Sequence, residues 1–327
     1  GDAMPAFIEI KNLTKKFGKK TVLNNINLEI PYGKIFGIIG ENGSGKTTLL
    51  NTIIGYYKPT SGKVLFQSLD VMHDMQGIER RFGFATQNGA FYSKLTVEEN
   101  LWYFGKLYGI EKKELKKRIN SLLELVELDD ARDVLAGNLS TGMQRRLEIA
   151  CALIHKPTVL ILDEPTEDLD PILRKEILAL IRRINKSGVT IIITSHLLQD
   201  LEDLCDVIAV LHKGKILQVG TPEELIKSYG KKQILRLKIK SRNYQQFIKA
   251  MLKKGATIED IDYEGNAVLL YTEKGEQLLN IALKTAKALK EKLEIVSLEN
   301  IPLNICLLYT SDAADELDGV DLGGRRI

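Results

Sequence analysis

The sequence predicts an α/β fold with a mixed sheet, followed by a smaller α+β domain. Short apolar runs end directly in polar residues, as expected for parallel strands that are covered on both faces and end at a ligand-binding edge. A glycine-rich loop at residues 40–47 lies between one such run and a helix pattern. From residue 231 the pattern changes to alternating strands and amphipathic helices. We therefore expect a first domain over residues 4–230 and a second over residues 231–305.

The glycine-rich loop is typical of a phosphate-binding loop (P-loop). It follows an apolar run at 35–39 and precedes a helix pattern at 47–54. Glycines let backbone N–H groups turn toward phosphate oxygens, and the helix N-terminus adds a favourable dipole. The lysine can reach the β- and γ-phosphates, and the threonine after it can ligate Mg²⁺. We expect contacts to a nucleoside triphosphate from Gly40, Asn42, Gly43, Ser44, Gly45, Lys46, Thr47 and Thr48.

A second apolar run, at 158–162, ends in Asp163 and Glu164. A strand in this position brings both carboxylates to the edge of the sheet where ligands of open α/β folds bind. Asp163 suits the coordination shell of Mg²⁺, directly or through water. Glu164 can polarise the water that attacks the γ-phosphate. Beside a P-loop, this pair predicts metal-assisted hydrolysis more strongly than it predicts two solvated acids at the end of a strand.

A third segment resembles the LSGGQ motif of the ATP-binding subunits of ABC transporters. It reads Leu139-Ser140-Thr141-Gly142-Met143-Gln144 and opens a helix pattern. A serine before a glycine at a helix start offers a hydroxyl and free N–H groups to an anion. With the P-loop and the acidic pair, this motif identifies the chain as a member of that family. The resemblance implies a P-loop NTPase fold of the ABC ATPase type, with a helical insert at about 88–150.

The family resemblance assigns roles to three more residues. Gln87 matches the glutamine that senses Mg²⁺ and the attacking water and faces the membrane partner. His196 matches the switch histidine that contacts the γ-phosphate. Phe17 stands where the family usually has a tyrosine that stacks on adenine; an aromatic face suffices for stacking, and a simple core position is the alternative.

Two segments depart from the family pattern. Thr141 and Met143 replace a glycine and a glutamine of the commonest motif, and related drug-exporter subunits tolerate such variants. Asp168 stands where the following loop usually has glycine. Because that loop contacts the opposite subunit, Asp168 puts the timing of hydrolysis in doubt more than its occurrence.

The resemblance also implies partners and cofactors. Two copies form a head-to-tail dimer, with each ATP and Mg²⁺ between the Lys46 loop of one chain and the Ser140 and Gly142 segment of the other. Closure and hydrolysis drive a separate membrane permease, which we expect to export drugs, antibiotics, lipids or polysaccharide; import stays open. The alternative is a soluble ABC ATPase acting on ribosomes or DNA. Such proteins carry two ATPase units or long coiled coils, whereas this chain has one P-loop and one LSGGQ-like motif.

Composition supports this interpretation. The chain has 327 residues, with 44% hydrophobic and 27% charged, as in ordinary globular proteins. The net charge of +3 is too small to predict a nucleic-acid partner. Three cysteines without metal-ligand spacing fit a reducing compartment. No stretch of ~18 apolar residues occurs, so we expect a cytoplasmic protein held at the membrane face through its permease.

The second domain and the chain end are described by pattern. Strands are expected at 234–240, 267–271 and 293–296, and helices at 247–252 and 276–289. This order favours a ferredoxin-like sandwich and resembles the accessory domain of drug- and antibiotic-exporter ATPases. It suggests a role in subunit assembly or permease docking. Residues 306–327 resemble the translation of a sequencing-library adapter, so we expect a non-native tail; a natural acidic disordered tail is the alternative.

Overall fold

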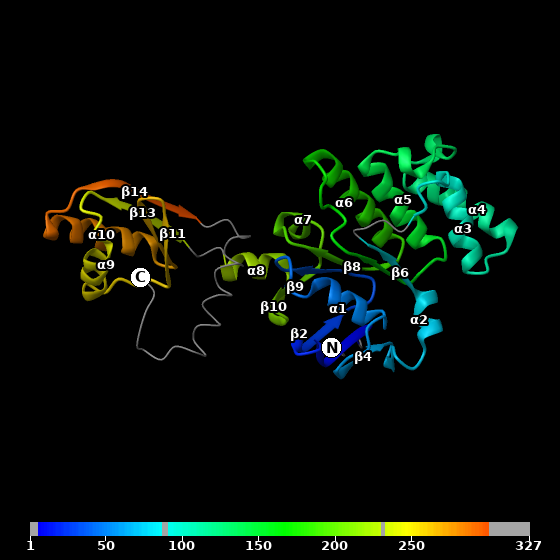
Figure 1. Ribbon diagram of the computed structural model, residues 1–327, viewed down its shortest axis with the longest axis horizontal. Coiled ribbons are helices and arrows are strands. Elements are labelled where there is room, and N and C mark those ends of the chain that lie inside the picture. Colours follow the sequence, from blue (N-terminus) through cyan, green and yellow to red (C-terminus); the bar gives the residue numbers. More distant parts are fainter. Residues whose placement is uncertain (1–5, 87–90, 230–232, 301–327) are drawn as a thin grey trace. The chain divides into compact units, whose positions relative to one another are not determined.

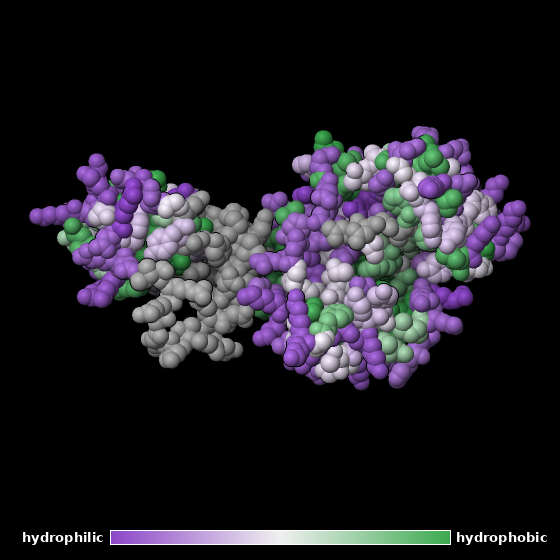
Figure 2. Space-filling model, viewed as in Figure 1, coloured by the Kyte–Doolittle hydropathy of each residue, from purple (hydrophilic) through white to green (hydrophobic). Residues whose placement is uncertain are grey.

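The computed structural model describes residues 6–86, 91–229 and 233–300, which are drawn as ribbons in Figure 1. The chain divides into two compact units, with the boundary between Pro222 and Glu223. Gln87 and the tail at 306–327 lie outside the described residues. In the face shown in Figure 2, both units are mostly hydrophilic, with apolar residues gathered in small patches. None of the helices within the described ranges has the length and apolar character needed to cross a bilayer.

A six-stranded mixed sheet forms the centre of the first unit. Its strand order is β10-β9-β3-β8-β7-β6, and all neighbouring pairs are parallel except β10 with β9. The runs predicted as buried strands, β3 and β7, are buried along their whole length. The strands are β3 (Ile35–Ile39), β6 (Phe82–Ala85), β7 (Val159–Leu162), β8 (Thr190–Ser195), β9 (Val207–His212) and β10 (Lys215–Gly220).

A second, antiparallel sheet packs against the first through a shared core. Its order is β2-β1-β4-β5, from β1 (Ile8–Phe17), β2 (Lys20–Ile30), β4 (Ser61–Phe66) and β5 (Leu69–Asp70). Alternate residues of β1 and β2 point into this core, together with Leu49, Leu50 and Ile53 of α1 (Lys46–Ile53). The helix that follows the P-loop is therefore fixed by apolar packing in this core.

A helical layer follows β6 in the chain. α3 (Val97–Leu107), α4 (Lys112–Leu125) and α5 (Thr141–Leu153) pack against one another (Figure 1). α3 begins at a capping box, in which the Thr96 hydroxyl accepts from Glu99 N and the Glu99 carboxylate accepts from Thr96 N. The remaining elements of this unit are α2 (Met75–Arg81), α6 (Pro171–Lys186), α7 (Leu198–Glu202) and 3₁₀ turns at Asp129–Ala131 and Ala136–Asn138.

The second unit is a βαββαβ sandwich. Its antiparallel sheet has the order β12-β13-β11-β14, the arrangement of a ferredoxin-like fold. Alternate residues of β11 and β13 share a core with α9 and α10, so both helices cover one face. The elements are α8 (Pro222–Tyr229), β11 (Gln233–Ile239), α9 (Tyr244–Lys253), β12 (Asp260–Glu264), β13 (Ala267–Thr272), α10 (Gly275–Leu289) and β14 (Leu293–Asn300). The predicted fold class is confirmed, although β12 was not expected from the sequence.

Candidate nucleotide-binding site

The P-loop joins β3 to α1, and its backbone requires glycine at several positions. Gly43 and Gly45 have φ of 86° and 109°, in the left-handed region where side chains are strained. Gly40 has no room for a side chain, because a Cβ there would lie 2.4 Å from the carbonyl oxygen of Leu211. The loop therefore keeps a tight turn directly before α1, whose N-terminus favours an anion.

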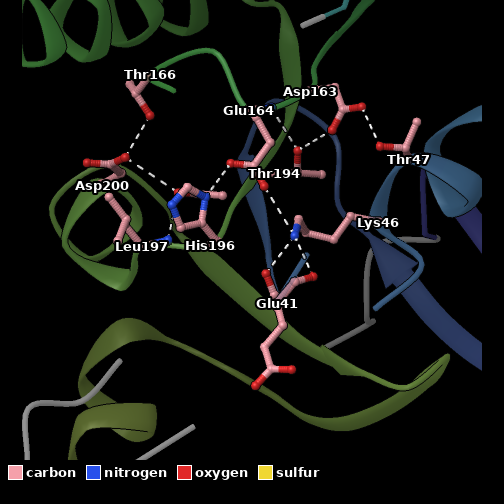
Figure 3. A network of polar contacts seen from close by, with 12 residues as sticks. Glu41, Lys46, Thr47, Asp163, Glu164, Thr166, Thr194, His196, Leu197 and Asp200 are labelled. Atoms are coloured by element: carbon pink, nitrogen blue, oxygen red, sulfur yellow. Dashed lines mark hydrogen bonds and ion pairs between the residues drawn. The ribbon is translucent and has the colours of Figure 1, made fainter. Parts of the chain in front are cut away.

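Lys46 is the buried cation of this site, with only 6% of its surface exposed. Its Nζ donates to the carbonyl oxygens of Gly40 at 2.6 Å and Glu41 at 2.9 Å, and it lies 3.1 Å from Glu164 Oε1 (Figure 3). All three partners are oxygens, so the ammonium is compensated within its own chain. Phosphate oxygens offer the same chemistry and can replace these partners.

Asp163 directly follows β7 and is held by two threonine hydroxyls. Thr47 Oγ1 donates to Asp163 Oδ2 at 2.7 Å, and Thr194 Oγ1 donates to Asp163 Oδ1 at 2.7 Å (Figure 3). Thr194 was not expected from the sequence; its Oγ1 also accepts from the backbone N of Glu164 at 2.9 Å. The signal that could have found it is the one used for Asp163, a polar residue where a buried strand ends.

The side chains of Thr47 and Asp163 fit a hard divalent cation. Mg²⁺ prefers oxygen ligands and is usually bound by one or two protein groups together with phosphate oxygens and water. Of the three predicted donors, Thr47 and Asp163 meet at the start of α1, beside the P-loop, and Gln87 lies outside the described residues. Across the described ranges, no group of three or more His, Cys, Asp or Glu side chains forms a metal cage. Thr47 and Asp163 therefore suit a cation whose other ligands are water and the phosphate oxygens of a bound nucleotide.

Glu164 joins the two ends of the site. Its Oε1 faces Lys46, and its Oε2 lies 2.9 Å from His196 Nδ1. The residue is 6% exposed and has a φ of 51°, a left-handed conformation that costs a glutamate of order 1–3 kcal/mol. This backbone conformation places the carboxylate between Lys46 and His196.

A second polar cluster fixes the loops after β7 and β8. Asp200 of α7 is 3% exposed and accepts from Thr166 Oγ1 at 2.6 Å (Figure 3). Ser195 Oγ donates to the same carboxylate oxygen at 3.4 Å and accepts from Leu197 N at 2.9 Å. These bonds hold the segment on either side of His196, so the imidazole is oriented by buried groups and not by its own contact alone.

These groups open onto a cavity of about 530 Å³. Phe17 stands at its wall with 42% of its surface exposed, which excludes the simple core position. Tyr57 makes an edge contact with this ring at 5.1 Å, and Lys15 Nζ lies 4.8 Å from the ring centre. The cavity is lined by Phe17, Lys20, Val22, Asn42, Gly43, Gly45, Lys46, Thr47, Thr48, Glu164 and Glu167.

The LSGGQ-like segment forms a separate site. Ser140 is exposed and is the N-cap of α5, where its Oγ accepts from Met143 N at 3.3 Å. Gly142 is buried, and a Cβ there would lie 3.0 Å from Leu173 Cδ2, so α5 approaches α6 closely. Neither residue is among those that line the P-loop cavity. The chain thus presents two half-sites for an anion in different places.

Comparisons with known proteins agree with this geometry. A family profile described as "ABC transporter" matches residues 23–167. The linearmycin resistance ATP-binding protein LnrL of Bacillus subtilis (strain 168) is 35% identical over 236 residues, which cover 72% of this chain and 76% of LnrL. The bacitracin transport ATP-binding protein BcrA of Bacillus licheniformis is 36% identical over 278 residues, which cover 84% of this chain and 88% of BcrA.

A solved structure has the same fold. It is the dimeric post-hydrolysis state of the ATP-binding cassette MJ0796 bound to ADP and Pi, with a TM-score of 0.60 and 29% identity. The match covers 66% of this chain and 98% of that one. The similarity in fold, in family profile and in sequence over most of two relatives leads to one assignment. The chain belongs to the ABC transporter family, as one of its ATP-binding, ATP-hydrolysing subunits.

Proposed function

We propose that two copies of this chain bind two ATP with Mg²⁺ between them and drive a separate membrane permease that exports an antibiotic or a similar compound. The observation that carries the proposal is the buried polar network of Lys46, Asp163, Glu164 and His196 beside the P-loop. Burying such a network costs free energy that apolar packing would not. Binding of a charged ligand therefore explains it better than stability does.

In the proposed site, Lys46 exchanges its carbonyl and carboxylate partners for phosphate oxygens. The P-loop from Gly40 to Thr48 surrounds the phosphates, and Phe17 at the cavity wall stacks on the base. Thr47 and Asp163 hold Mg²⁺, which stabilises the negative charge that develops on the phosphates. Gln87 would complete this shell by family resemblance, and it lies outside the described residues.

The exchange at Lys46 has a consequence for Glu164. Its Oε1, 3.1 Å from the ammonium without nucleotide, is freed when the lysine turns to phosphate. The carboxylate can then accept a proton from the attacking water, while His196 keeps Oε2 in place at 2.9 Å and contacts the γ-phosphate with its other edge. Nucleotide binding thus activates the base in the same step.

The second half-site supports the proposed dimer. Ser140 offers an exposed hydroxyl at a helix start but does not line the cavity of its own chain. A second copy, turned head to tail, can bring the Ser140 and Gly142 segment against the ATP of the first. The related MJ0796 cassette is described as dimeric.

An apolar cavity of about 250 Å³ supports the permease partner. Its wall includes Met75 of α2, Phe84 of β6, Phe104 of α3 and Tyr108. β6 ends one residue before Thr86, which leads directly to Gln87. We propose that a cytoplasmic segment of the permease fills this hollow, which holds the chain at the cytoplasmic face of the membrane.

Export is proposed from the relatives and from the second unit. LnrL is named for resistance and BcrA for bacitracin transport, and resistance is a natural consequence of removing an antibiotic from the cell. The 278 residues matched to BcrA exceed the length of the first unit, so the similarity extends into the ferredoxin-like unit. No relative described here is named for ribosomes or DNA, which leaves the soluble alternative without support.

The test is the Glu164→Gln variant, which keeps the shape of the side chain and removes the base. It should bind ATP and form an ATP-dependent dimer, measured by size exclusion, while steady-state hydrolysis falls at least ~100-fold. Glu114→Gln is the matched control, because Glu114 contacts Arg118 on α4 away from the cavity. Near-normal turnover by Glu164→Gln would contradict the proposed mechanism.

A further inference from the structure

Helix α5, whose N-cap is Ser140, is attached to strand β6 near both of its ends. At its C-terminal end, Gly83 of β6 allows close approach, since a Cβ there would lie 2.2 Å from the carbonyl oxygen of Ala152. At its N-terminal end, Arg145 Nη1 donates to the carbonyl oxygen of Thr86 at 3.5 Å, just past β6. With both ends attached, α5 and β6 are expected to move together.

The arginine of the N-terminal attachment also belongs to a buried ion pair within α5. Arg145 is 8% exposed and Glu148 is 5% exposed, and Arg145 Nη1 donates to Glu148 Oε2 at 2.9 Å. Burial raises the pKa of the Glu148 carboxyl, and Arg145 opposes this rise. Apolar side chains of similar volume often stabilise a fold as well as a buried pair does. The proposed hydrolysis also does not use this pair, so stability and chemistry both leave it unexplained.

From β6 the connection continues to the metal-binding carboxylate. Ala85 is paired with Leu162 in the parallel ladder of β6 and β7. The carbonyl oxygen of Ala85 accepts from Asp163 N at 3.1 Å, and Asp163 in turn accepts from Thr47. A continuous series of contacts therefore runs from the Ser140 end of α5 to the nucleotide cavity of the same chain.

We infer that Arg145 and Glu148 are a positioning pair that couples the two ATP sites of the dimer. The pair keeps the N-terminal end of α5 in a fixed position relative to β6, and therefore relative to Asp163. The occupancy of a chain's own cavity then sets how that chain presents Ser140 to the ATP held by its partner copy. The inference rests on the proposed head-to-tail dimer.

The neighbouring arginine provides a matched control. Arg146 has the same exposure of 8%, but it points toward other elements. It donates to the carbonyl oxygen of Val126 at 3.1 Å and to Glu176 Oε2 on α6 at 3.0 Å. Replacing Arg146 removes a buried cation from the same helix and leaves the attachment to β6 intact.

The experiment uses the Glu164→Gln chain, whose ATP dimer should persist. Into it we would introduce Arg145→Met with Glu148→Leu, which removes both charges together, or Arg145→Lys, which keeps the charge but replaces the planar guanidinium by a shorter side chain. Mg-ADP binding to the monomer should stay within ~2-fold of the parent. ATP-driven dimerisation should weaken at least ~10-fold in both variants, the scale of losing a hydrogen bond to a charged group. Arg146→Met should keep the parent's dimerisation constant.

The outcomes are distinct. If either Arg145 variant dimerises as tightly as Arg146→Met, the coupling role is overturned. An equal loss of Mg-ADP affinity and dimerisation also overturns it, because the pair would then stabilise the whole unit and not specifically the coupling between the two ATP sites. If the Glu164→Gln parent itself forms no dimer with ATP, the proposed function fails first and the inference falls with it.

Discussion

The two units of the chain bury different kinds of side chain. Among the described residues, the buried polar groups of the second unit are two threonines, Thr272 and Thr285. Its core is otherwise apolar, built from alternate strand residues and the faces of α9 and α10. In the first unit the buried charged residues are Lys46, Arg145, Arg146, Glu148, Asp163, Glu164 and Asp200.

The difference locates the function. A buried charge costs free energy unless it is paired and hydrogen-bonded. The first unit bears this cost beside the P-loop, and adds backbone strain there, with φ of 51° at Glu164 and 61° at Asp168. Among its described residues the second unit buries no charged side chain, although Arg242 and Lys290 there also have positive φ, of 57° and 52°. The buried charges therefore place the chemistry in the first unit.

The strongest test of this contrast is a cavity in the second unit. Phe247 of α9 is 1% exposed in the apolar core. Phe247→Ala should cost about 3–5 kcal/mol of the stability of that unit, as large-to-small core substitutions do. Thermal unfolding should show an earlier transition, while steady-state ATP turnover below that transition stays within ~2-fold. A parallel loss of turnover would show that the first unit depends on the second for its folding or its site.

The opposite test removes a buried charge from the first unit. Lys46→Met should lower kcat/KM for ATP by ~10²–10³, the scale of losing one preorganised donor to developing charge. The matched control is Lys34→Met, because Lys34 makes an exposed ion pair with Asp206 at 3.6 Å. Exposed pairs contribute about 0–1 kcal/mol, so this control should keep normal turnover. Equal effects of the two substitutions would remove the distinction between buried and exposed lysines.

Much of the first unit could be predicted because its signals are local. The P-loop, the Asp163-Glu164 pair and the Ser140 cap each follow from a short motif and its flanking strand or helix. The α+β class of the second unit was also predictable from period-2 and helical patterns. β12 was missed because its sequence, Asp-Ile-Asp-Tyr-Glu, has no apolar run and three acidic residues disfavour a strand.

The contacts between elements were not predictable in the same way. Thr194 Oγ1 forms hydrogen bonds with both Asp163 and Glu164, which lie 31 and 30 residues before it in the chain. Only the parallel pairing of β7 with β8 brings these residues together. The Arg145 contact to Thr86 depends on how α5 packs on β6. A charged residue in a helix pattern is normally read as solvated, so its burial became visible only in the fold.

The smallest expected effect is a change in thermal unfolding midpoint, which should have opposite signs for substitutions at two partly exposed glutamates, Glu167 and Glu114. Glu167 lines the nucleotide cavity, where burial raises the pKa of its carboxyl above 4.5, and the charges of Glu164 and Asp168 raise it further. Its stabilising protonated form is therefore fully present below the ordinary pKa and lost as pH rises through the folded-state pKa. Glu167→Gln lacks this loss, so without nucleotide its unfolding midpoint should rise relative to wild type, by at most about 2 °C, between pH 4.5 and neutral.

Glu114 should behave in the opposite way. The hydrogen bond from Arg118 lowers the pKa of its carboxyl, so its stabilising ionised form is present above the ordinary pKa and lost as pH falls through the lowered value. Glu114→Gln should therefore fall slightly below wild type at neutral pH and approach it in acid. If thermal unfolding over a pH series gave both variants the same sign, the cavity would not differ electrostatically from the rest of the surface. Opposite signs would show that, within the first unit, a carboxylate at the nucleotide cavity is destabilised by ionisation while one in an exposed ion pair is stabilised by it.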